Sequence, residues 1–100
     1  MIKVLIEKEN NNINKITING HAKYADFGKD IVCSSVSSIV ITTINAIERF
    51  DKNYINHSYD KETLSIEVIK NNEITSNLIN NMIDLLKELE CDYPKNIKIL

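Results

Sequence analysis

Two residues in the first third of the chain are of types that perform nucleophilic catalysis. Cys33 carries a thiol, which attacks electrophiles as its thiolate, and His21 carries an imidazole, which exchanges a proton near neutral pH. Gly20, directly before His21, permits a tight turn and a close approach of a substrate backbone. The combination is typical of a Cys-His dyad, and we predict Cys33 as the nucleophile and His21 as the general base and acid.

The spacing of apolar residues after residue 30 predicts the helix that would position Cys33. Apolar side chains recur at three- and four-residue steps over residues 31–50, and Asp30 directly before them is the predicted N-cap. Cys33 would then lie in the first helical turn, where unpaired backbone N–H groups favour a thiolate. Residues 21–30 show no periodicity, and we predict that residues 22–30 form a mobile loop that brings His21 to Cys33 and closes over the substrate.

Several other polar and aromatic residues are weaker candidates. We expect Gly20, Asp30 and Ser37 to support the dyad or to bind substrate. Ser37 lies one turn after Cys33, where its hydroxyl could bond near the sulfur or back to its own helix. Tyr24 and Phe27 would either cover an apolar substrate side chain or pack structurally. Cys91 is predicted to be a packing residue, and His57 receives no role.

Residue statistics alone favour a simpler interpretation of the same residues. A cysteine near a helix start is more often a small buried apolar residue than a nucleophile, and a single histidine in a loop is more often only polar. Asp30 as an N-cap needs no catalytic role, although both roles can hold at once. The dyad therefore depends on a wider pattern.

Further periodicities complete the predicted fold. Alternating strands joined by short polar stretches are predicted at residues 2–8 and 13–18, and again at 54–59 and 64–69. A second amphipathic helix is predicted from about residue 76 to residue 90, and Pro94 shortly after it prevents the helix from continuing. A last strand is predicted at residues 97–100. The order β-β-α-β-β-α-β predicts an α+β fold, with two helices packed on a mainly antiparallel sheet.

Length and composition limit the possible classes. One hundred residues, 43% hydrophobic and 26% charged, are typical of one globular domain over residues 1–100. We find no apolar run near the roughly 20 residues of a membrane span and no signal peptide, which predicts a cytoplasmic protein without membrane contact. The two cysteines are far apart in sequence, so we expect free thiols, no metal site and no cofactor. A net charge of −2 argues against direct nucleic-acid binding.

The pattern around the two candidate residues resembles the motif of a known family, the ribosomal-processing cysteine proteases called Prp. The resemblance extends over essentially the whole chain, with Ser34 and Ser35 standing where family members often have Ala or Gly. The matching residues are Gly20-His21-Ala22-x-Tyr24-Ala25-x-x-Gly28-x-Asp30-Ile31-Val32-Cys33-Ser34-x-Val36-Ser37 and Asn45-Ala46-Ile47.

This resemblance implies a function and a substrate. It implies a cysteine endopeptidase that removes the N-terminal extension from the precursor of large-subunit ribosomal protein L twenty-seven, cutting after a Phe-Phe-type sequence. The family's histidine and nucleophile fall on His21 and Cys33 of this chain. The resemblance also implies a homodimer, which we expect as well because two helices on one face of a sheet would leave apolar strand residues uncovered on the other.

Two other classes of protein remain open from the residues themselves. One is a non-catalytic factor that binds a ribosomal protein or RNA during ribosome assembly, although no pair of stacking aromatic residues stands on a predicted strand. The other is a thiol-based redox or acyl-transfer enzyme, which would be expected to carry a Cys-x-x-Cys motif or a nearby resolving cysteine.

Overall fold

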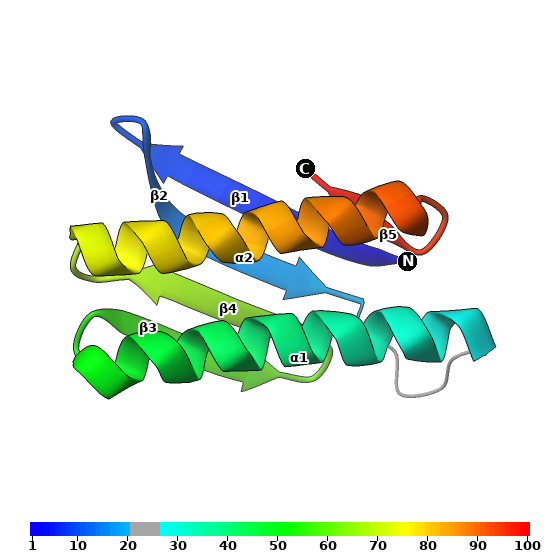
Figure 1. Cartoon of the computed structure of the whole chain (residues 1–100), viewed down its shortest axis with the longest axis horizontal. Coiled ribbons are helices and arrows are strands. Elements are labelled where there is room, and N and C mark those ends of the chain that lie inside the picture. The colour runs from blue at the N-terminus through cyan, green and yellow to red at the C-terminus, as the bar shows by residue number, and fades with distance from the viewer. Residues whose placement is uncertain (21–26) are drawn as a thin grey trace.

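Two helices cover one face of a five-stranded sheet (Figure 1). The computed structural model describes the backbone of residues 1–20 and 27–100 and the side chains of residues 1–20 and 31–100. In chain order the elements are β1 (Ile2–Glu9), β2 (Asn12–Asn19), α1 (Phe27–Phe50), β3 (Ile55–Asp60), β4 (Thr63–Val68), α2 (Glu73–Asp92) and β5 (Ile97–Ile99). The predicted element order and the α+β class are confirmed.

The strand order across the sheet is β3-β4-β2-β1-β5, with β3 and β5 at the two edges. The pairs β1–β2, β2–β4 and β3–β4 are antiparallel, whereas β5 pairs parallel to β1 through Ile2↔Ile97 and Val4↔Ile99. Asn10 and Asn11 connect β1 to β2 with φ values of 53° and 66°. Asparagine tolerates this left-handed conformation better than most residues, which suits it to a tight hairpin turn.

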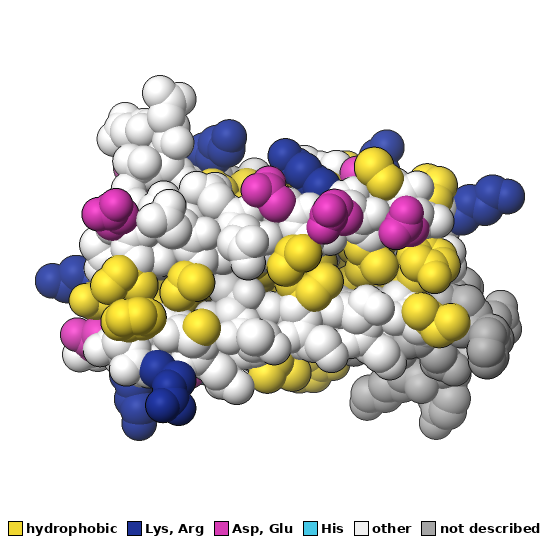
Figure 2. Space-filling model, in the orientation of Figure 1, with side chains coloured by type: hydrophobic (Ala, Val, Ile, Leu, Met, Phe, Trp, Pro, Cys, Tyr) yellow, Lys and Arg dark blue, Asp and Glu magenta, His cyan; other side chains and the backbone are white. Residues whose placement is uncertain are grey.

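The core lies between the helix layer and the sheet. Alternate residues of the strands point to the helices, and α1 and α2 each turn an apolar face toward them. Figure 2 looks onto the helix layer, where apolar side chains gather between the two helices and acidic side chains follow α2. The largest fully buried side chains are Ile16, Ile18, Ile47, Ile55, Ile66, Ile79, Met82, Leu86, Ile97, Val4, Val32 and Val36.

The opposite face of the sheet is largely polar. On this face Glu7, Lys15 and Glu67 are paired across β1, β2 and β4. Leu5, Thr17 and Ser65 are paired across the same three strands. Leu5 is 43% exposed. The argument that apolar strand residues on this face need the cover of a second copy is therefore wrong, and a dimer has to be argued from other surfaces.

Both helices begin earlier than the sequence predicted. α1 starts at Phe27, so Asp30 lies inside the helix and is not its N-cap, and residues 27–30 are helical where we expected a loop. α2 starts at Glu73 because Asn72 caps it, accepting a hydrogen bond of 2.8 Å from the Thr75 N–H.

α1 also corrects the statement that no segment approaches the length of a membrane span. Ile31–Phe50 has 20 residues and a mean hydropathy of 1.5, enough in length and composition to cross a bilayer. The apolar character has another explanation in the fold, because Val32, Val36 and Val40 are buried against the sheet and α2.

Candidate active site

Cys33 lies on the sheet side of α1, and 8% of its surface is exposed. Because the helix begins at Phe27, Cys33 lies beyond the first turn. The unpaired N–H groups at the helix start belong to earlier residues, so the predicted stabilisation of a thiolate by those groups does not hold. A catalytic Cys33 would depend on a neighbouring side chain such as a histidine for its activation.

The end of β2 lies beside the part of α1 that follows Cys33. Ile18, near the end of β2, lines the same cavity as Val36 and Ser37 of α1, and Figure 1 shows β2 ending under this part of the helix. His21 itself lies outside the described residues, as does Tyr24. The end of β2 thus lies near the turn of α1 that follows Cys33, while the position of His21 relative to Cys33 stays a prediction.

Gly20 ends the described part of the chain before His21, and its conformation requires glycine. Its φ is +87°, a region that other residues rarely adopt. A Cβ at this position would also meet the carbonyl oxygen of Met1. The backbone conformation thus explains a glycine directly after β2, whereas its predicted role near the substrate stays a prediction.

We expect Gly20→Ala to destabilise the protein by about 1–3 kcal/mol, because the new side chain is strained and meets Met1. Thermal unfolding measures this change. Gly28→Ala is the matched control: Gly28 lies in α1, where alanine is favoured over glycine by about 0.5–1 kcal/mol. Equal stability of Gly20→Ala and the parent protein would contradict the strained turn.

The remaining sequence candidates are placed as follows. Ser37 is half-buried on α1, one turn after Cys33, and lines the cavity shared with Ile18. The backbone of Asp30 lies in α1, but its side chain and that of Phe27 are outside the description. Cys91 is exposed near the end of α2, so its predicted packing role is wrong.

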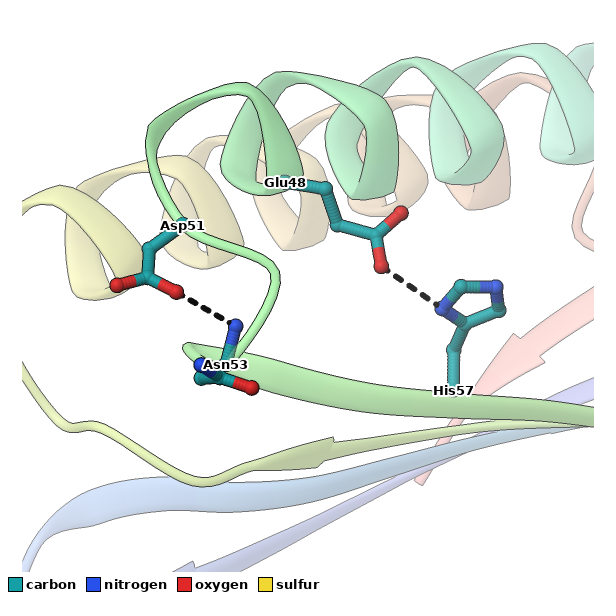
Figure 3. Close-up of polar contacts among 4 residues, drawn as sticks. All are labelled: Glu48, Asp51, Asn53 and His57. Atoms are coloured by element: carbon teal, nitrogen blue, oxygen red, sulfur yellow. Dashed lines mark hydrogen bonds and ion pairs between the residues drawn. The ribbon is translucent and has the colours of Figure 1, made fainter.

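His57 was given no role from the sequence, but the structure places it in a cavity. It stands on β3 with Nδ1 3.6 Å from Oε2 of Glu48 on α1, and 41% of its side chain is exposed (Figure 3). Nearby, Asp51 accepts a 2.8 Å hydrogen bond from the Asn53 N–H in the turn between α1 and β3. His57 and Tyr59 are two residues apart on β3, so the sequence could have indicated that they lie on the same face of the sheet. The sequence could not have indicated that α1 packs opposite them.

The titratable side chains of the described residues do not gather into a metal site. Within residues 1–20 and 31–100, no group of three or more His, Cys, Asp or Glu side chains is arranged to hold a metal ion. Cys33 and Cys91 are both free thiols. Cys33, the predicted nucleophile, belongs to the buried apolar cluster of the core.

Comparisons with known proteins assign the chain to a class and then to a family. The family model described as cysteine protease Prp matches residues 1–98. The chain is thus a cysteine protease. It belongs to the Prp family of ribosomal-processing cysteine proteases.

Individual relatives carry the same description. Ribosomal processing cysteine protease Prp of Mycoplasma pneumoniae is 36% identical over 88 residues, covering 83% of this chain and 82% of the relative. Prp of Bacillus subtilis is 27% identical over 111 residues, covering 99% and 96%. The resemblance inferred from the sequence motif is confirmed.

Solved structures agree with the fold. Prp from Staphylococcus aureus in complex with a substrate peptide matches with a TM-score of 0.91 and 25% identity, covering 100% of this chain and 98% of that one. A second S. aureus Prp structure, with a covalently linked product peptide, matches with a TM-score of 0.86 and 26% identity, covering 99% and 97%. That enzyme therefore both binds a peptide substrate and forms a covalent bond to a product peptide.

Proposed function

We propose that this protease removes the N-terminal extension from the precursor of large-subunit ribosomal protein L twenty-seven, cutting after a Phe-Phe-type sequence, with Cys33 and His21 as its catalytic dyad. The observation that carries the proposal is the family match over residues 1–98. Membership in a protease family removes the grounds for a non-catalytic assembly factor or a redox enzyme. Because ribosomal proteins are made and assembled in the cytoplasm, the proposed substrate favours a cytoplasmic location for the enzyme.

The reaction follows from the chemistry of the two side chains. The Cys33 thiolate attacks the scissile carbonyl carbon, and backbone N–H groups stabilise the resulting oxyanion. The His21 imidazolium donates its proton to the departing amine, which leaves a thioester on Cys33. The departing amine is the new N-terminus of the shortened ribosomal protein. The same imidazole then removes a proton from water, which attacks the thioester. This step releases the extension peptide as a carboxylic acid and returns the thiol of Cys33. The covalent product peptide on the S. aureus relative supports such an intermediate.

The proposal is tested by incubating the purified protein with the extended precursor and measuring the mass of the products. We expect the loss of one N-terminal peptide and no change in precursor that already lacks its extension. An uncleaved precursor under conditions where the protein is folded would contradict the proposed substrate. Sedimentation of the same sample tests the homodimer, which stays a prediction because the polar sheet face does not explain it.

A further inference from the structure

An apolar groove runs between α1 and the edge strand β3, with a volume of about 280 Å³. Most of its lining is apolar. The α1 side includes Val36, Ser37, Ile41 and Ile44, and the sheet side includes Tyr59 from β3 and Leu64 from β4. Val36 and Ile44 are buried and form the floor, whereas the two residues at the rim, Ile41 and Tyr59, are 54% and 58% exposed.

The two rim residues expose large apolar side chains beside the hollow. Large apolar side chains that stay exposed around a hollow are typical of binding surfaces, because water is readily displaced from them. β3 is also an edge strand, and within the described residues no strand pairs with its outer side. Its free backbone groups can bind an extended peptide, a common mode of peptide recognition.

The groove lies on the same flank of α1 as Cys33 and begins one turn after it. Cys33, Ser37 and Ile41 follow one another at four-residue steps, so they form one row along the flank of α1. The α1 part of the lining extends from Val36 to Asn45. At 1.5 Å per helical residue this is roughly 13 Å, enough for about four residues of an extended chain.

The apolar part of the groove ends at a polar pair. His57 lines the cavity, and its Nδ1 lies 3.6 Å from the Glu48 carboxylate, which comes from the turn of α1 after Asn45. A peptide starting at Cys33 would therefore meet apolar surface first and charged or polar groups next. The groove can therefore select apolar side chains of a bound peptide only along its short apolar part.

We propose that the substrate peptide lies extended in this groove along β3, and that Ile41 and Tyr59 select apolar side chains within about four residues of the scissile bond. This inference rests on the proposed function, since it assigns the peptide cleaved at Cys33 to this surface. In an extended chain alternate side chains point the same way, so every second residue would enter the groove. The occupant is the substrate, not a second copy of the enzyme.

The test compares Ile41→Asn with Ile69→Asn, a matched control because Ile69 is 51% exposed and is not part of the groove. We expect Ile41→Asn to lower kcat/KM for the extended precursor about tenfold or more, mainly through KM, and Ile69→Asn to stay within about twofold. Neither variant should change the rate at which iodoacetamide alkylates Cys33, since neither residue is adjacent to it in the helical row.

A second set of measurements shows whether Ile41 contacts the substrate itself. Each apolar residue near the cleavage site of the precursor is replaced by serine in turn, and cleavage is measured with the parent enzyme and with Ile41→Asn. At one or two alternate substrate positions, we expect serine to lower the cleavage rate of the parent enzyme but to have little effect on that of Ile41→Asn. The reason is that Ile41→Asn has already lost the contact with that substrate side chain. An effect through folding would lower all substrates equally.

The outcomes separate this inference from the proposed function. Cleavage by the parent enzyme with both variants within twofold would overturn the groove and leave the proposed function standing. Failure of the parent enzyme to cleave the precursor would overturn both. If Ile41→Asn lowers activity only by converting a dimer into monomers, as sedimentation would show, the groove binds a second copy and the inference is wrong.

Discussion

Cys33→Ala is expected to abolish cleavage of the precursor, by a factor on the order of 10⁴ to 10⁶, because the reaction loses its nucleophile. Cys33 is one of only two cysteines in the chain, and a cysteine protease needs one of them. Cys91→Ala is the matched control and should retain full activity, since Cys91 is exposed at the end of α2. The measurement is the rate of product formation by mass spectrometry.

Stability must be measured on the same Cys33→Ala protein, because Cys33 is part of the buried core. Removing a buried sulfur without other changes should cost about 1–2 kcal/mol, a loss that leaves a typical domain folded. Normal turnover by Cys33→Ala would show that the nucleophile assignment is wrong. Full inactivation together with global unfolding would favour a structural role for Cys33 instead.

His21→Ala is expected to lower the cleavage rate by roughly 10² to 10⁴-fold, the usual contribution of a general acid and base. Because α1 does not supply helix-start N–H groups to Cys33, we expect the histidine to contribute more to the activation than the sequence suggested. Added imidazole should restore part of the activity, since a small molecule can enter the space that the side chain vacates. A variant with normal activity, or one that unfolds and gains nothing from imidazole, would contradict the assignment.

The periodicity of the sequence predicted the elements and their inward faces because burial alone produces that signal. The alternation of Ile16 and Ile18 marked β2, and the face with Met82 and Leu86 marked α2. Helix starts depend on local capping, which periodicity does not detect. Asn72, whose side chain caps α2, stands outside the apolar pattern from which that helix was predicted.

The arrangement of the strands could not be predicted in the same way. Which strands become neighbours depends on contacts between residues far apart in sequence, and the faces of β1 and β5 are compatible with several orders. The groove was missed for the same reason. Ile41 and Tyr59 are apolar residues at ordinary positions in their elements, and only the placement of α1 over the β3 edge makes them a rim.

The motif around Cys33 indicated its function better than the general burial tendency of a single cysteine did. Statistics of burial favoured a packing role, and the structure indeed places Cys33 in the core with 8% exposure. The family match over residues 1–98 shows that the chain is nevertheless a cysteine protease. A buried position and a reactive role are compatible when the substrate or a neighbouring segment reaches the sulfur at the boundary of the core.

The pairing of β1 with β5 has a consequence for how the protein is made. Ile2 pairs with Ile97 and Val4 with Ile99. One side of β1 therefore stays unpaired until residues 97–99 are available. During synthesis the N-terminal hairpin can form early, but the contact with β5 joins segments separated by almost the full length. This ribosomal-processing protease can thus complete its own sheet only after residue 99 has emerged from a ribosome.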